Sequence, residues 1–244
     1  MIQEAPSFNW HPDFLPSVVS IMTLTVCFVT FWFLSESTAI HQRLSTHRNK
    51  VSASIAKVVY QKALGALLLG VIPFLIAVFF LRYSVVEYGL GFQNTGTSML
   101  WISGIATVVI PLNIRAAQRP ENLDYYPMIR AEKWTWRLVL LNALATITYL
   151  FSYEVLFRGI LLTACVDTLG VWPGIAVNVA LYSTTHLPKG PAETIGAIPF
   201  GLLMCYITLT TGTIWVAVVA HVILSLSNDY LAVYYNPNMQ FSRK

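Results

Sequence analysis

The chain has 244 residues, of which 56% are hydrophobic and only 11% are charged. A soluble domain carries about 25% charged residues, so these charges are too few to solvate a water-facing surface. This composition excludes an ordinary soluble enzyme, a disordered chain and a disulfide-stapled secreted module, and a net charge of +4 is too small to indicate nucleic acid as a partner.

Long apolar stretches predict membrane-spanning helices, because about 20 helical residues cross the hydrocarbon core of a bilayer. In chain order we expect seven spans, at 17–35, 63–81, 97–114, 138–165, 171–187, 192–210 and 213–235. The three cysteines lie inside these stretches without metal-ligand spacing and are interpreted as small hydrophobic residues. The expected fold is an all-α, polytopic transmembrane helix bundle of about seven to eight spans.

The distribution of Lys and Arg between the loops predicts the orientation of the bundle. Thirteen basic residues fall on one side: five in the loop 36–62 (Lys62 among them), five in the loop 115–137, and Lys189, Arg243 and Lys244. Arg82 alone falls on the opposite side, and Arg158 lies within a span. Because basic loops face the cytosol, we expect the amino terminus outside and the carboxyl terminus inside a bacterial or archaeal cell membrane.

A polar linker over 119–124 divides the chain into two parts. Residues 1–124 are expected to form amino-terminal transmembrane helices and cytosolic loops, and residues 125–244 the core with the informative polar groups. The two parts together are expected to form one membrane domain. Residues 125–137, in which aromatic side chains alternate with charges, predict a helix lying on the membrane surface.

A few ionisable side chains lie within the predicted spans, where each costs at least about 2.5 kcal/mol unless it has a partner. Glu154 and Arg158 share a helix face, which fits a structural ion pair as well as a functional site. His186 and His221 lie in the next spans, where a single histidine is more often a hydrogen-bond partner between helices. Helix rise places Glu154 and both histidines at a similar depth, toward the cytosolic half.

One carboxylate and two imidazoles at one depth indicate two kinds of site. They suit Zn²⁺ with an open coordination position, for which Glu154, His186 and His221 are the predicted ligands. They also suit a metal-free site that positions and activates water. The sequence leaves both open.

Three segments resemble the successive motifs of the CPBP intramembrane proteases, the family that includes CAAX prenyl endopeptidases and bacteriocin-processing or immunity proteins. They are YEVLFRG at 153–159, YSTTH at 182–186 and HVILS at 221–225. The family pattern is Glu-Glu-x-x-x-Arg, then an aromatic residue with His four residues later, then His-x-x-x-Asn or Asp. The resemblance extends over residues 138–230.

The resemblance implies a protease of metallo- or glutamic type. By the family pattern, Glu154 activates water or ligates a metal, and Arg158 holds Glu154 in place. His186 and His221 bind metal or water and stabilise the oxyanion.

The chain departs from the family pattern at two positions. Tyr153 stands in place of the first Glu, to which the family assigns water activation, and Ser225 replaces the Asn or Asp of the third motif. Tyr153 is expected either to donate a hydrogen bond to an oxyanion or to pack as an aromatic. Glu193 is a second acid that could compensate, although a first-turn acid also interacts favourably with the helix dipole. Asp229 is expected to face the cytosolic headgroups.

Three functions compete. The first is an endopeptidase that cuts a hydrophobic or lipidated, membrane-associated peptide or protein near the cytosolic half of the bilayer. The second is a catalytically inactive scaffold or immunity protein that binds a partner, a hypothesis motivated by Tyr153 and Ser225. The third, a transporter, rests on intramembrane charges alone, and the chain lacks the two similar halves of many transporters. Membrane lipids are partners in all three.

Overall fold

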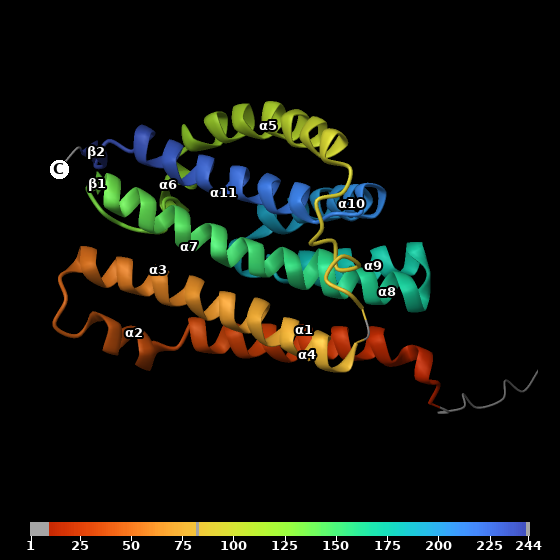
Figure 1. Ribbon diagram of the computed structural model, residues 1–244. Coiled ribbons are helices and arrows are strands. Elements are labelled where there is room, and N and C mark those ends of the chain that lie inside the picture. Colours follow the sequence, from red (N-terminus) through yellow and green to blue (C-terminus); the bar gives the residue numbers. More distant parts are fainter. Residues whose placement is uncertain (1–9, 82, 243–244) are drawn as a thin grey trace, which may run out of the picture.

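The computed structural model describes residues 10–81 and 83–242. Long helices lie side by side in one bundle (Figure 1), which confirms the all-α fold class. The helices are η1 (Pro12–Phe14), α1 (Leu15–Ser35), α2 (Thr38–Ser45), α3 (Lys50–Ala66), η2 (Leu67–Val71), α4 (Ile72–Phe80), α5 (Thr95–Ala117), α6 (Pro120–Tyr125), α7 (Trp136–Glu154), η3 (Val155–Leu161), α8 (Leu162–Leu169), α9 (Val171–Thr184), η4 (Leu187–Lys189), α10 (Pro191–Thr211) and α11 (Trp215–Tyr235). Two short strands, β1 (Lys133–Thr135) and β2 (Gln240–Ser242), pair in parallel at one end.

Six helices of the described chain are long and apolar enough to cross a membrane, so this is a multi-pass membrane protein. They are Pro12–Ser35, Lys50–Phe80, Thr95–Ala117, Trp136–Leu169, Pro191–Thr211 and Trp215–Tyr235. The remaining predicted span, 171–187, corresponds to α9, which has only 14 residues. At a rise of about 1.5 Å per residue, α9 is shorter than the hydrocarbon core of a bilayer, and it ends beside the buried His186.

The predicted basic loop over 36–62 is largely helical, which corrects the sequence interpretation. α2 and α3 occupy most of it, and α3 continues through η2 and α4 to Phe80. Lys62 therefore lies inside a spanning helix, where it is 7% exposed. The surface helix predicted over 125–137 is also wrong, because α6 ends at Tyr125 and the chain then passes through β1 into α7.

α7 lies between the amino-terminal helices and α11 (Figure 1). The largest apolar core joins Leu24 and Cys27 of α1 to Phe157 and Leu161 of η3. The short helix α9 packs closely on α8 because Gly174 has no side chain: a Cβ there would lie 2.7 Å from the backbone nitrogen of Val166. The amino-terminal helices and α9 thus hold the η3 segment from different sides.

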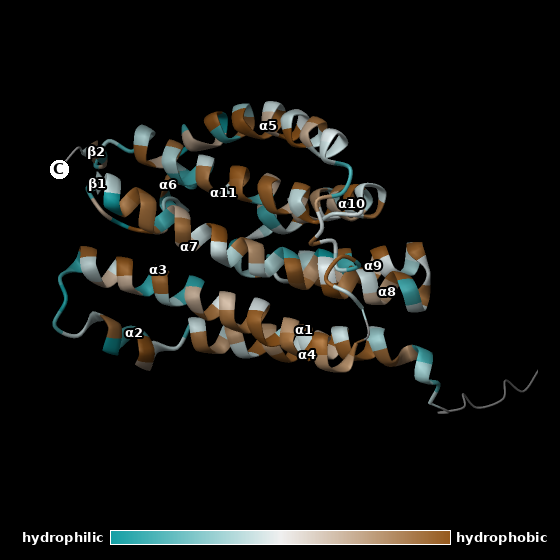
Figure 2. Ribbon diagram, viewed as in Figure 1, coloured by the Kyte–Doolittle hydropathy of each residue, from teal (hydrophilic) through white to brown (hydrophobic). Residues whose placement is uncertain are grey.

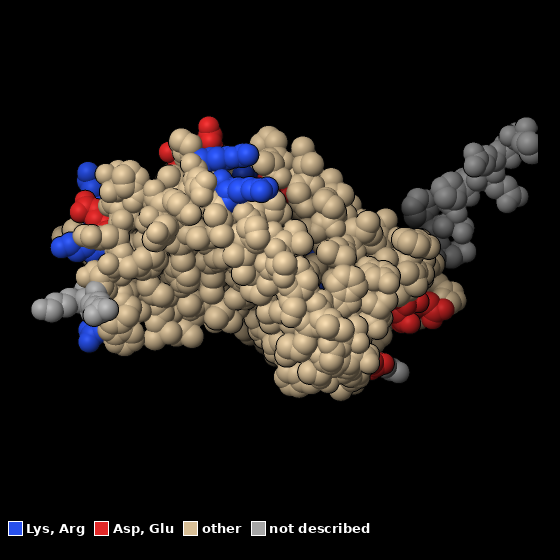
Figure 3. Space-filling model, turned by 90° about the horizontal axis from the view of Figure 1, so that it is seen from above, with Lys and Arg blue, Asp and Glu red and all other residues tan. Residues whose placement is uncertain are grey.

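Charge distinguishes the two ends of the bundle. Hydrophobic residues cover most of the long helices (Figure 2). In Figure 3, Lys and Arg lie at the left end and near the middle of the upper edge, whereas only acidic side chains are visible at the right end. We call the end with α2, α6 and the two strands the basic end. The acidic end is the opposite one, where the segments 83–94 and 211–214 lie. Arg82, Arg243 and Lys244, which entered the charge count, lie outside the described residues. The expected orientation of the termini stays a prediction.

Candidate active site

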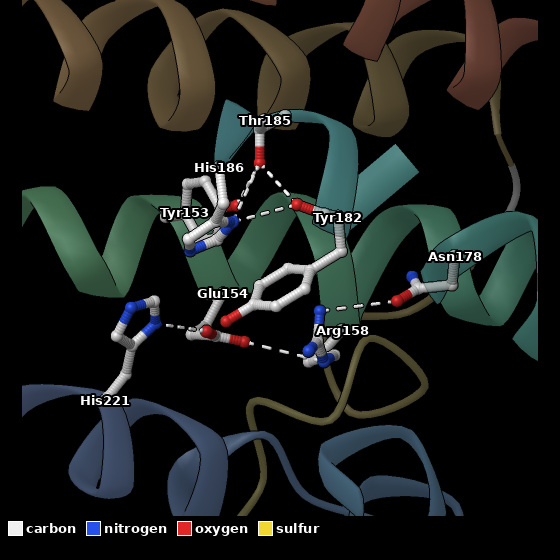
Figure 4. Close-up of polar contacts among 8 residues, drawn as sticks. All are labelled: Tyr153, Glu154, Arg158, Asn178, Tyr182, Thr185, His186 and His221. Carbon is white, nitrogen blue, oxygen red and sulfur yellow. Dashed lines mark hydrogen bonds and ion pairs between the residues drawn. The ribbon is translucent and has the colours of Figure 1, made fainter. Parts of the chain in front are cut away.

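Glu154 is fully buried at the end of α7 and contacts charged or polar groups from two directions (Figure 4). Its Oε1 accepts a hydrogen bond from His221 Nδ1 of α11 at 2.7 Å, and its Oε2 lies 3.7 Å from Arg158 Nε. Because an ionised carboxylate only accepts hydrogen bonds, Nδ1 of His221 carries the proton and Nε2 keeps its lone pair. The expected Glu154–Arg158 pair is therefore present, and His221 joins it.

Arg158 is held by a local change of helix type. It lies in η3, a π-helical turn, and such turns loosen the regular backbone hydrogen bonding within a helix. Asn178 of α9 donates to the Phe157 carbonyl at 2.6 Å and accepts from Arg158 Nη1 at 3.3 Å. The guanidinium carbon lies 4.3 Å from the centroid of the Tyr182 ring, within the range of a cation–π interaction.

Asn178 is the site residue that the sequence analysis missed. It is completely buried and contacts η3 as well as Cys205 of α10, whose thiol donates to Asn178 Oδ1 at 3.2 Å. A lone Asn in an apolar stretch was the available signal, because a buried amide in a membrane requires partners on neighbouring helices.

His186 follows α9 and precedes η4, and its ring lies beside the rings of Tyr153 and Tyr182 (Figure 4). Its Nδ1 donates to the Tyr182 carbonyl at 2.9 Å, so its Nε2 also keeps a lone pair. The His186 ring packs on the Tyr182 ring with 4.7 Å between centroids. Each histidine thus has one nitrogen fixed by the protein and one basic nitrogen left over.

The Tyr153 ring packs near both histidines. Its ring centroid lies 6.3 Å from that of His186 and 5.7 Å from that of His221. Thr185 donates its hydroxyl proton to a backbone carbonyl, so the Tyr153 hydroxyl is the donor in its 2.6 Å bond to Thr185 Oγ1. The interpretation as a packed aromatic fits this arrangement, since the Tyr153 hydroxyl is already engaged.

The three predicted metal ligands do not fit a zinc site in this arrangement. Both oxygens of Glu154 face other protein groups, and His221 turns Nδ1, not Nε2, toward that carboxylate. Within residues 10–81 and 83–242, no group of three His, Cys, Asp or Glu side chains is placed to hold a metal ion. Zinc stays a prediction.

Glu193 lies apart from Glu154. Its carboxylate accepts a hydrogen bond from Tyr126 at 2.5 Å and pairs with Lys189 at 3.4 Å. Burial, and then the charge of Glu193, raise the pKa of Tyr126, so the phenol stays protonated and donates. Glu193 is thereby part of a surface contact. Ser225 is partly buried on α11 and makes no side-chain hydrogen bond within the described chain.

Asp229 is buried, with 2% of its surface exposed, which contradicts the expectation that it faces the headgroups. It accepts a hydrogen bond from Asn142 of α7 at 3.0 Å, and Lys62 donates to Thr146 of the same helix at 2.7 Å. The opposite charges of Lys62 and Asp229 attract each other across α7. A second buried polar cluster therefore connects α3, α7 and α11.

Residue positions along α7 and α11 show how far Glu154 and His221 lie from the two ends of the bundle. His221 lies six residues after the first residue of α11, Trp215, and fourteen before the last, Tyr235. Glu154 likewise lies closer along its helix to Leu169, near the acidic end, than to Trp136. Both members of the hydrogen-bonded pair are thus nearer the acidic end along their helices, and the expected position in the cytosolic half of the bilayer stays a prediction.

Residues 133–227 match the family model described as type II CAAX prenyl endopeptidase Rce1-like. The match extends from β1 into α11 and contains Glu154, Arg158, His186 and His221. No curated protein matches the chain, and no solved structure does.

Proposed function

We propose that this chain, a member of the CPBP family of intramembrane proteases, hydrolyses a peptide bond of a hydrophobic or lipidated membrane-associated substrate within the bilayer. The observation that carries the proposal is the 2.7 Å hydrogen bond from His221 Nδ1 to the buried Glu154, which leaves Nε2 basic. A carboxylate that fixes one imidazole nitrogen while the other accepts a proton is a recurring arrangement in hydrolases.

In the proposed reaction, His221 Nε2 removes a proton from water while the hydroxide attacks the carbonyl carbon of the peptide bond. Glu154 stabilises the imidazolium that forms, and Arg158 keeps Glu154 ionised. His221 then delivers the proton to the leaving amine as the C–N bond breaks. His186 Nε2 orients the water by accepting its second hydrogen. The base that the first family Glu supplies is thus replaced, since Tyr153 occupies its position.

The experiment compares cleavage of a farnesylated reporter peptide, and of its unlipidated counterpart, by the purified protein in lipid vesicles. We expect Glu154→Gln and His221→Gln to lower turnover by about a hundredfold or more. Glu193→Gln is the matched control, because it removes an acid on a neighbouring helix outside the site. Cleavage that persists in Glu154→Gln and His221→Gln would contradict the proposal. Equal cleavage of both peptides would contradict the lipidated substrate class.

Metal removal tests the chemistry separately. Because Glu154 and His221 form a hydrogen-bonded pair and no ligand set, we expect 1,10-phenanthroline to leave the turnover of the vesicle-bound protein unchanged. Loss of turnover on chelation, restored by added Zn²⁺, would instead assign Glu154, His186 and His221 as metal ligands.

A non-catalytic scaffold that binds hydrophobic partners is the second candidate. It is favoured by the Tyr153 ring, which packs near both histidines where the family carries its first acid. In that case a cellular phenotype of the deletion would be rescued by Glu154→Gln as well as by the unchanged protein. Rescue that requires both Glu154 and His221 would exclude it.

A further inference from the structure

A cavity of about 320 Å³ opens at the acidic end and extends inward to Arg158. The exposed side chains of Glu87 and Asp167 lie at its outer part, where Tyr83 donates to Asp167 at 2.6 Å. The buried Arg158 and Thr208 form its inner end. The cavity thus reaches the guanidinium that pairs with Glu154.

Buried polar atoms without a hydrogen-bond partner gather at this inner end. Among the residues that line the cavity they are Arg158 Nε and Nη2 and Thr208 Oγ1, and Glu154 Oε2, which lies 3.7 Å from Arg158 Nε, also lacks one. Buried polar groups in native proteins nearly always bond to protein or to ordered water, and an unpaired group in a low-dielectric interior is costly. The cavity is far larger than the roughly 30 Å³ that one water occupies. Bound water is therefore the simplest partner for all four atoms.

The charges around the cavity select a neutral ligand. Glu87 and Asp167 at the outer part disfavour anions, and Arg158 at the inner end disfavours cations. Leu162, Val166 and Leu209 line the wall between them and offer no hydrogen bonds from their side chains. Water is small and neutral and can bond at both ends.

We propose that this cavity is a water-access site, which admits water from the acidic end to Arg158 and Glu154. It supplies the molecule consumed in hydrolysis, whose hydroxyl goes to the carbonyl carbon and whose proton goes to the leaving amine. The supply rests on the proposed function, whereas the hydration of the cavity does not. The position of Glu154 and His221 nearer the acidic end makes this path the shorter one.

Thiol labelling tests the hydration without any need for activity. In a protein whose three native cysteines are replaced by Ser or Ala, Cys is introduced at Thr208, at Thr163 on the cavity wall, or at Tyr206, an exposed residue on α10 outside the cavity. Methyl methanethiosulfonate, a small uncharged thiol reagent, is added to one side of sealed vesicles, and reduced glutathione on the other side quenches any reagent that crosses the membrane. Glu87→Cys identifies the side that faces the acidic end.

We expect Thr208→Cys and Thr163→Cys to react from the acidic side at least about tenfold faster than Tyr206→Cys, because only a solvated thiol ionises readily. Failure of both positions to react, in vesicles where Glu87→Cys reacts, would overturn the proposal. Because the labelling needs no substrate, its result tests the hydration of the cavity whether or not the protein is a protease.

The supply of water is tested by filling the inner end. Thr208→Leu is expected to lower turnover by about tenfold without changing KM, while Thr208→Ser, which keeps the hydroxyl, retains turnover. Thr163→Cys labelling in the Thr208→Leu background reports that the variant folds with its outer cavity accessible. Full turnover in Thr208→Leu would overturn the supply of water through this cavity.

Discussion

Two buried polar clusters lie against α7, and they differ in what they leave free. The site cluster consists of Glu154, Arg158 and His221, and the support cluster consists of Lys62, Asn142, Thr146 and Asp229. The site cluster leaves a basic imidazole nitrogen unused. In the support cluster, two opposite charges lie close enough to attract each other, and each is hydrogen-bonded to α7. We therefore expect an unused imidazole nitrogen, and not the burial of charge alone, to mark the chemistry in this bundle.

The largest expected effect that separates the clusters concerns Lys62. Lys62→Met removes the hydrogen bond to Thr146 and a positive charge near the buried Asp229, which should lower the free energy of unfolding by about 1–3 kcal/mol. The turnover of the folded fraction should stay unchanged, because Lys62 contacts no member of the site cluster. Reversible unfolding in mixed detergent micelles measures the free energy of unfolding, and vesicle assays measure the turnover.

The double variant Lys62→Met/Asp229→Asn is the matched control. It removes both charges, so part of the lost stability should return. If Lys62→Met instead abolished turnover in protein that remains folded, the support cluster would belong to the chemistry and the distinction would fail.

A smaller effect is expected at Tyr153, which lies beside the site cluster without joining its hydrogen bonds. Tyr153→Phe keeps the ring beside the two histidines and removes only the bond to Thr185. The free energy of unfolding should fall by about 1 kcal/mol, with turnover unchanged. A large loss of turnover at unchanged stability would show that the Tyr153 hydroxyl takes part in the reaction, and that the site cluster is larger than the geometry indicates.

The site cluster was predictable from the sequence only where its residues lie close together in the chain or stand out as ionisable groups in an apolar span. Glu154 and Arg158 lie one helical turn apart, and His221 is conspicuous in an apolar span. The π-helical turn and the Asn178 contact that hold Arg158 have no sequence periodicity of their own, so they emerge only in the folded chain.

The support cluster was not predictable for a different reason. Lys62 and Thr146 are 84 residues apart, and Asn142 and Asp229 are 87 apart. The polar start of α3 looks like a loop in a hydropathy pattern, and the pattern gives no information on which helices become neighbours. The same limit applies to the short helix α9, whose apolar composition indicates a span although its length does not.

The smallest effect is expected at Glu193, an acid that belongs to neither cluster. Its pair with Lys189 lies at the surface, where such pairs contribute about 0.2–1 kcal/mol. Glu193→Gln keeps an oxygen that accepts from Tyr126, so the contact between α10 and the segment before β1 should persist. Both stability and turnover should therefore change little, as measured by the same unfolding and vesicle assays. A loss of turnover comparable to that of Glu154→Gln would place the second acid in the reaction and would show that a surface carboxylate reaches the site in the working protein.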